Sequence, residues 1–150
     1  MRRIPAIILL IFSFSIVTTQ ITICRGNDAK AGQAYEHEDT REIVALVNDA
    51  AELVYTKGEA AFNDFRASGS RWRQGDNNIY VLDTRGNMVV HPDLGMEGKN
   101  VLDLKDINGK PIIRGLIGAA MVPGKPEGWY HYEWPVPGGM LPRWKSTYVR

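Results

Sequence analysis

The chain has 150 residues, of which 44% are hydrophobic and 23% are charged, so it is long enough and apolar enough for one domain with a buried core. The formal net charge of +1 creates no overall field that would favour nucleic acid. Two short basic stretches contain a tryptophan, at 71–73 and 143–145, but they fit buried or pocket-facing tryptophans at least as well. We therefore expect no nucleic-acid partner.

The first 24 residues have the pattern of an export signal. Arg2 and Arg3 precede Ile4–Ile23, a largely apolar stretch without charge. This stretch could also span a bilayer as a helix, so residues 1–24 are either a signal peptide or an N-terminal anchor. A lipid-modified N-terminus at Cys24 is a further alternative, although Ile23 stands where a small residue is expected. We predict a linker over 25–33 and an exported protein, periplasmic or extracellular, which is either free or held at the membrane by this segment.

A long helix is predicted after the linker. Asp39 and Glu42 have the spacing of a capping box, so the helix should begin near Asp39. Lys57-Gly58 is a candidate C-terminal cap, but the helical pattern continues over Glu59–Arg66, and the sequence leaves open whether Gly58 ends a helix or lies within one. Spacings of three and four define one buried face, formed by Ile43, Val44, Val47, Ala50, Ala51, Val54 and Tyr55.

Four strands and a short helix are predicted in the second half of the chain. The strands are Ile79–Asp83, Asn87–His91, Trp129–Trp134 and Trp144–Val149. Pro111 fits the first position of a helix whose apolar face runs from Ile112 to Ala120. The connections around Gly86 and Pro137–Gly139 are too short for parallel crossovers, so we predict an α+β fold with an antiparallel sheet.

Neither a catalytic motif nor a metal-binding motif is apparent. The three histidines, His37, His91 and His131, are far apart and have no cysteine partner, which argues against a zinc site. Gly118–Lys125 lacks the spacing of a phosphate-binding loop, and there is no Gly-x-Ser-x-Gly nucleophile motif. We therefore predict that the protein is not an enzyme and has no cofactor and no metal.

The last two strands combine aromatic and basic residues, the mixture that small-ligand pockets use. Alternation places Tyr130, Tyr132 and Trp134 on one face of their strand, and Arg143, Lys145 and Thr147 on one face of theirs. Lys145, His91 and tyrosine hydroxyls could together hold a carboxylate. Each of these residues also has a purely structural interpretation: Lys145 on a solvated strand face, His91 at a strand end, and the tyrosines in the core.

Several local motifs follow one another in a characteristic order. They are Lys57–Phe62 with Phe65, Trp72–Asp76, Tyr80–Asp83 with Gly86, His91-Pro92, Gly98-Lys99-Asn100, Gly128–Trp134 and Lys145–Val149. In this order the chain resembles the single-Cache domain of the second type, an extracytoplasmic sensor module, over roughly Ala31–Arg150. No single motif is decisive, but the ordered series is quite specific.

The resemblance implies a long N-terminal helix packed on a PAS-like antiparallel sheet, with one pocket beside the sheet. It implies a sensory input for signal transduction or chemotaxis, with a small organic ligand as partner and a carboxylate favoured. It also implies candidate ligand-binding residues, to which Trp134 is added because it shares a strand face with Tyr132: Trp72, Tyr80, His91, Tyr132, Trp134 and Lys145.

One departure from the family concerns the C-terminal end. The family normally continues into one more apolar strand, which lies centrally beside the first, whereas this chain stops at Arg150. We therefore expect residues 34–150 to form a single Cache domain that is C-terminally truncated and lacks its last strand. The missing strand would leave Ile79–Leu82 with an open edge, so the monomer should be marginally stable.

In the family the domain usually precedes a transmembrane helix and an output module, which the 150 residues do not contain. We therefore expect either a free-standing periplasmic binding protein or one whose output lies in a partner, for which a membrane receptor is the candidate. An alternative function is a periplasmic structural or interaction protein that uses the N-terminal helix to form a homodimer or to bind a membrane partner. In that case the helix face through Val44, Val47, Ala51 and Val54 would make the contact.

Overall fold

The computed structural model describes residues 6–13, 35, 37–75, 77–135 and 141–150, with side chains from residue 35 onward. The predicted linker over 25–33 and most of the predicted export segment lie outside the described residues. The strands are β1 (Ala6–Ser13), β2 (Arg73–Gln74), β3 (Asn77–Asp83), β4 (Met88–Val90), β5 (Gly128–Trp134) and β6 (Arg143–Val149). The helices are α1 (Glu38–Lys57), α2 (Ala61–Arg66) and α3 (Ile112–Ala120), with single 3₁₀ turns η1 (Gly58–Ala60) and η2 (Leu94–Met96).

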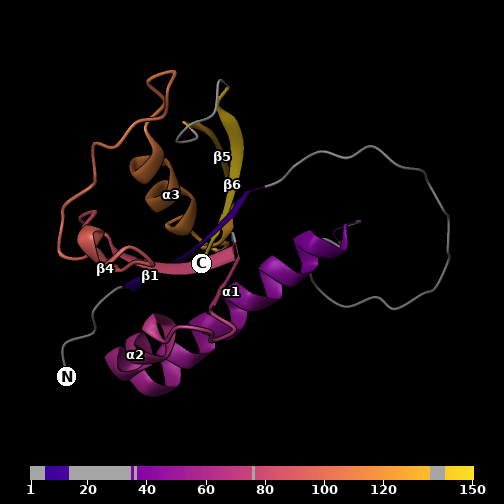
Figure 1. Cartoon of the computed structure of the whole chain (residues 1–150), viewed down its shortest axis with the longest axis vertical. Helices are drawn as coiled ribbons and strands as arrows, with labels where there is room; N and C mark the ends of the chain where they lie inside the picture. Colours follow the sequence, from indigo (N-terminus) through magenta and orange to yellow (C-terminus); the bar gives the residue numbers. More distant parts are fainter. Residues whose placement is uncertain (1–5, 14–34, 36, 76, 136–140) are drawn as a thin grey trace, which may run out of the picture.

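The strands form one antiparallel sheet, in the order β2-β3-β1-β6-β5, with β4 paired to β3. Helices α1 and α2 cover one face of this sheet and α3 covers the other (Figure 1). The predicted α+β fold, with one long helix on an antiparallel sheet, is confirmed. None of the helices formed by the described residues is both long and apolar enough to cross a membrane.

Helix α1 differs from the prediction at its start and on one side. It begins at Glu38 and its cap residue is His37, which makes no side-chain capping bond, so the capping box at Asp39 is wrong. Asp39 lies within the first turn instead, where a negative charge still favours the helix dipole. Tyr55, predicted on the buried face, is 91% exposed. Of the two alternatives left open for Gly58, the structure has the first: Gly58, with φ +59°, ends α1, and α2 starts after η1.

Two apolar clusters lie on opposite faces of the sheet because β3 alternates. Ile79 and Val81 contact the cluster beneath α1 and α2, whereas Tyr80 and Leu82 belong to the cluster beneath α3. Strand β6 divides in the same way, with Tyr148 in the first cluster and Val149 in the second. Both faces of the sheet are therefore covered in its centre, and all of Ile79–Asp83 is buried.

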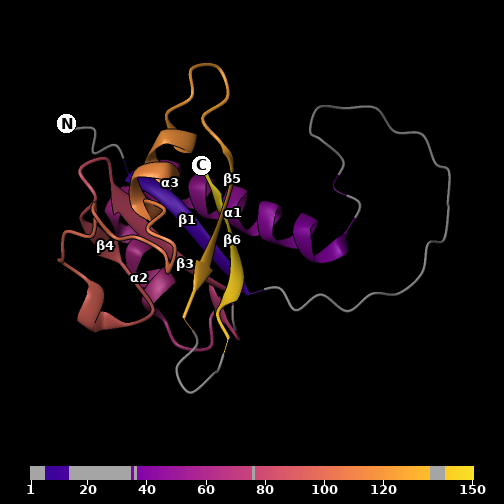
Figure 2. The same cartoon turned by 90° about the horizontal axis from the view of Figure 1, so that it is seen from above.

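The edge of β3 that we expected to be open is instead paired. Strand β1 lies between β3 and β6 and is antiparallel to both, with Leu9 opposite Tyr80 on one side and Val149 on the other (Figure 2). The N-terminal apolar segment thus provides the hydrogen-bonding groups that the edge of β3 requires. Part of the segment with an export-signal pattern is a strand of the sheet.

Candidate ligand-binding site

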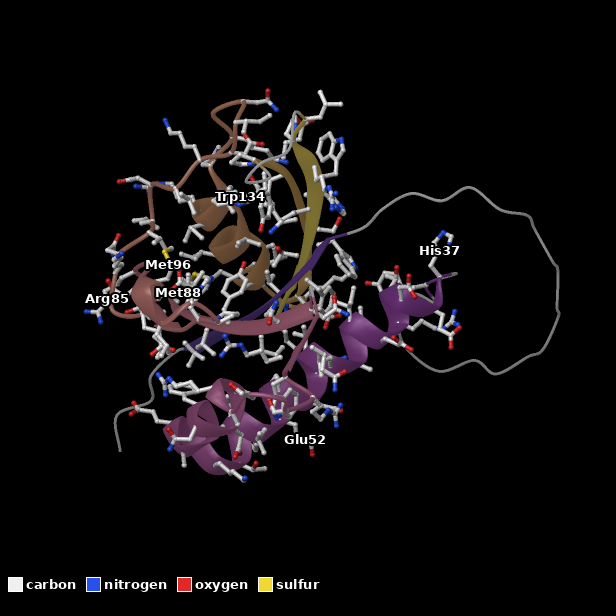
Figure 3. All side chains as sticks on the ribbon, in the orientation of Figure 1. His37, Glu52, Arg85, Met88, Met96 and Trp134 are labelled. Atoms are coloured by element: carbon white, nitrogen blue, oxygen red, sulfur yellow. The ribbon has the colours of Figure 1, made fainter. Side chains whose placement is uncertain are left out.

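A pocket of about 280 Å³ lies on the α3 side of the sheet. Its walls come from β3, β4, the loop containing η2, the start of α3, and the last two strands. The lining residues are Tyr80, Met88, His91, Asp93, Met96, Leu104, Ile112, Ile113, Tyr132, Trp134 and Lys145. Figure 3 shows three of them, Met88, Met96 and Trp134, on the same side of the sheet as α3, whereas Glu52 of α1 lies on the other.

The structure brings five of the six predicted ligand-binding residues together in this pocket and places Trp72 elsewhere. Trp72 is buried on the opposite face of the sheet, in the cluster beneath α1 and α2, and its ring meets the ring of Phe65 edge-on at 5.2 Å. It directly precedes β2, at the side of the sheet remote from β5 and β6. Trp72 therefore cannot contact a ligand in this pocket without a large rearrangement.

Buried hydroxyl groups gather at the sheet wall of the pocket. Tyr132 Oη lies 3.3 Å from Thr147 Oγ1, and Tyr80 belongs to the same hydrogen-bonded group. Burial raises the pKa of Tyr80 well above 10, and the neighbouring Tyr132 raises it further. Burial also raises the pKa of Tyr132, although hydrogen bonds to Thr147 and Tyr80 oppose the shift. Both phenols therefore remain protonated at neutral pH and can donate hydrogen bonds.

A cation lies beside these hydroxyls. Lys145 is half-buried on β6, directly opposite Tyr132 on β5, and its Nζ is 5.9 Å from the centre of the Trp134 ring. The ring of Trp134 in turn meets that of Tyr132 edge-on at 6.3 Å. Because strand alternation points Tyr132, Trp134 and Lys145 to one face, the predicted grouping of aromatic and basic side chains is present.

His91, which directly follows β4, lines the pocket from the part of the sheet that contains β3 and β4. Its pKa is lowered because burial disfavours the charged ring, although a hydrogen bond to the Asp93 backbone opposes this, so the ring is neutral at pH 7. His91 Nδ1 lies 2.9 Å from the backbone nitrogen of Asp93 and 3.1 Å from its carbonyl oxygen. In the neutral ring, Nδ1 accepts from the N–H of Asp93 and the proton is on Nε2. A neutral His91 in this form offers one further donor.

The loop that carries His91 and Asp93 is tied to elements on the helix side. Glu97 accepts a bond from the His91 N–H at 3.0 Å and another from Arg66 Nε of α2 at 3.0 Å. Arg66 also donates to the carbonyl of Val89, and Arg73 of β2 donates to that of Pro92 at 2.7 Å. This network gives the pocket rim a defined position relative to α2.

Glu97→Gln is expected to lower the free energy of unfolding by about 1–2 kcal/mol at pH 7, because it removes a charge-assisted pair. Burial raises the pKa of Glu97, but hydrogen bonds from Arg66 and His91 outweigh it, so the pKa is lowered in the folded protein. This contribution is present above the unfolded-state pKa and is lost as the pH falls through the folded-state pKa. Urea unfolding from pH 7 to pH 3 should show the two proteins converging below about pH 4.5; a difference independent of pH would contradict this.

The remaining lining residues were not among the predicted site residues. Met88, Leu104, Ile112 and Ile113 form apolar walls, and the sequence signal for the last two was only that of a helix face. Asp93 and Met96 line the rim, and no pattern in the sequence indicates this. Thr147, which is buried, was also not among the predicted ligand-binding residues, although strand alternation places it on the same face as Lys145.

A long helix on one face of an antiparallel sheet and a small aromatic pocket on the other define an α+β domain of the kind that binds small molecules. The family described as Single Cache domain 2 matches residues 17–150, and the chain belongs to this family of extracytoplasmic sensor domains. It is a sensory Cache domain, and domains of this family bind small ligands and sit in membrane receptors. Such domains are typically non-catalytic.

Among curated proteins, the chain is similar to the sensor histidine kinase MctS of Rhizobium johnstonii, with 33% identity over 146 residues. The match covers 88% of this chain but 31% of the kinase, so the chain spans about a third of that relative. Two solved structures share the fold. A periplasmic sensor domain of a chemotaxis protein has a TM-score of 0.54 and 24% identity, covering 75% of this chain and 94% of that one. A methyl-accepting chemotaxis protein of Vibrio parahaemolyticus has a TM-score of 0.55 and 22% identity, covering 75% and 87%.

Proposed function

We propose that this domain binds a small organic carboxylate in the pocket between the sheet and α3, and that binding is the extracytoplasmic input to a signalling system. The observation that carries the proposal is the position of Lys145, half-buried beside Trp134 and opposite Tyr132 in the wall of a pocket with a volume of about 280 Å³. A cation in a site partly shielded from water favours an anionic ligand, and its bonds to a carboxylate are the stronger, charge-assisted kind.

The rest of the pocket suits a short ligand with one anionic end. The hydroxyls of Tyr80 and Tyr132 and the ring of His91 supply further donors around the cation. The apolar part of the pocket wall consists of Met88, Leu104, Ile112 and Ile113 and accommodates an apolar tail. The volume is just below the range of about 300–1,000 Å³ that is usual for small-molecule sites, so a ligand of a few carbon atoms fits best.

We infer that the domain works outside the cytoplasm and passes its signal to a membrane partner, as the similarity to a sensor histidine kinase suggests. Its role is binding, without turnover of the ligand. Dimerisation through α1 stays a prediction.

A thermal-shift panel tests this proposal. The whole chain is heated with increasing acetate, propionate or succinate, with acetamide and propionamide as matched neutral analogues, and with amino acids, amines and purines. A ligand that binds only the native state raises its melting temperature in a saturable way. We expect stabilisation by at least one carboxylate and none by its amide. Equal effects of acid and amide, or stabilisation by an amine or a purine alone, would contradict the proposal.

A further inference from the structure

The sheet of this domain consists of two parts. Among the described strands, β1 alone joins them. Strand β3 pairs with β2 and β4, and β6 pairs with β5, but β3 and β6 do not pair with each other. Strand β1 pairs with β3 over six residue pairs and with β6 over five. With neighbouring strands about 4.8 Å apart, β3 and β6 are separated by about 9.6 Å, the width of one inserted strand.

The backbone edges that face this gap are deeply buried. Residues Ile79–Leu82 of β3 and Thr147–Val149 of β6 all lie in the core, with helices over both faces of the sheet. Without a strand between them, their inward N–H and C=O groups would be unpaired in an apolar environment, at a cost of about 1–3 kcal/mol for each group. The gap between β3 and β6 therefore requires an extended chain.

We propose that this gap is a binding site for an extended apolar peptide strand, and that Ala6–Ser13 is its occupant in this chain. The segment AIILLIFS has no charge, no proline and no glycine, and it is rich in the β-branched isoleucine that favours strands. It pairs antiparallel to both neighbours, so the site selects direction as well as composition. The same apolar residues carry the export-signal pattern, and a segment inserted in a membrane cannot also occupy the gap.

The bound strand sets the width of the ligand pocket. Tyr80, Met88 and His91 come from the β3 side of the gap, whereas Tyr132, Trp134 and Lys145 come from the β6 side. The hydrogen bonds that join the hydroxyls of Tyr80, Tyr132 and Thr147 also connect the β3 side of the gap with the β6 side. Occupancy of the gap thus couples the N-terminal segment to the geometry of the pocket, whatever ligand the pocket binds.

Hydrogen exchange on the whole chain tests whether the strand is in place. A central strand has both backbone edges paired, so we expect the amides of residues 7–12 to exchange as slowly as those of Tyr80–Leu82, at least about 100-fold slower than in an unstructured peptide. Exchange of 7–12 at the unstructured rate, while Tyr80–Leu82 and Thr147–Val149 stay protected, would overturn the proposal.

A cleavable variant tests whether the gap binds a strand in trans. A specific protease site replaces residues 26–30 of the whole chain, and the N-terminal fragment is then released by cleavage. We expect the fragment to remain bound on size exclusion, and a labelled peptide of residues 4–14 with a solubilising lysine tag to replace it. The matched control is the same peptide with Leu9→Pro, which removes a ladder N–H in the middle of the strand and should bind about 100-fold more weakly.

Three further outcomes decide whether the gap binds a strand in trans. Unfolding upon loss of the fragment, reversed by the wild-type peptide but not by the proline peptide, supports the proposal. A fragment that leaves while the remainder keeps its melting temperature, or equal binding of the two peptides, overturns it. None of these outcomes depends on the carboxylate ligand, so this inference and the proposed function can fail separately.

Discussion

Lys145→Met is expected to weaken carboxylate binding by roughly 10- to 100-fold, because it removes one charge-assisted hydrogen bond while keeping the length of the side chain. Lys145 is the cation among the described residues that line the pocket, since burial keeps His91 neutral. The acid of the panel that most stabilises the wild-type domain is titrated into both proteins by calorimetry. Because the Lys145 side chain is half-buried at the pocket wall, the fold should tolerate methionine, and thermal unfolding checks this.

Lys125→Met is the matched control for this experiment. Lys125 is an exposed cation in the turn before β5 and does not line the pocket. Its replacement changes the net charge by the same amount, so it reports any effect of overall charge on the affinity. We expect the affinity to stay within about twofold of wild type. Equal affinities of the Lys145 variant and the wild type would show that the carboxylate is bound without this cation. The binding site would then lie elsewhere in the domain.

Gly115→Ala is expected to lower the free energy of unfolding by about 1–3 kcal/mol, although alanine is the better helix former. A Cβ atom at Gly115 in α3 would overlap the ring of Tyr130. That ring cannot easily move aside, because Tyr130 Oη donates to the carbonyl of Pro111 at 2.7 Å and Lys110 Nζ lies 4.4 Å from the ring centre. The methyl group would therefore push α3 away from β5. Urea unfolding measures the change.

Gly118→Ala provides the control on the same helix. A Cβ atom at Gly118 meets no other atom within 4 Å, so only the helix preference of alanine acts, and we expect stabilisation by up to about 1 kcal/mol. Opposite signs for the two variants would identify the contact with Tyr130 as the cause. Stabilisation by both substitutions would instead mean that α3 and β5 pack less closely than the structure shows.

Much of the pocket follows from strand alternation. The period of two along β5 and β6 places Tyr132, Trp134 and Lys145 on one face, and the structure brings them to one pocket wall. The end of α1 at Gly58 is likewise a local property, because a positive φ suits glycine. The assignment to the Cache family also rested on local motifs in a fixed order.

Other features depend on which distant segments meet. Arg66 and Glu97 are 31 residues apart, and no periodicity indicates that they pair and hold the rim at His91. Trp72 appeared equivalent to the pocket aromatics, yet the turn before β2 directs it into the opposite cluster with Phe65. Asp39, predicted to cap α1, is the second residue of its first turn, since helix ends also respond to what the preceding chain does.

The sequence by itself determined the fold class, the positions of the long helix, of α3 and of the strands β3 to β6, and the face that carries Tyr132 and Lys145, because these depend on periods of 3.6 and 2 and on turn residues within a few positions. Only the tertiary structure decided that Ala6–Ser13 lies between β3 and β6, and that Trp72 lies apart from the pocket. An uncharged apolar segment has the same composition whether it enters a membrane or a sheet. Which of the two it enters depends on whether distant strands have unpaired backbone N–H and C=O groups with which it can form hydrogen bonds.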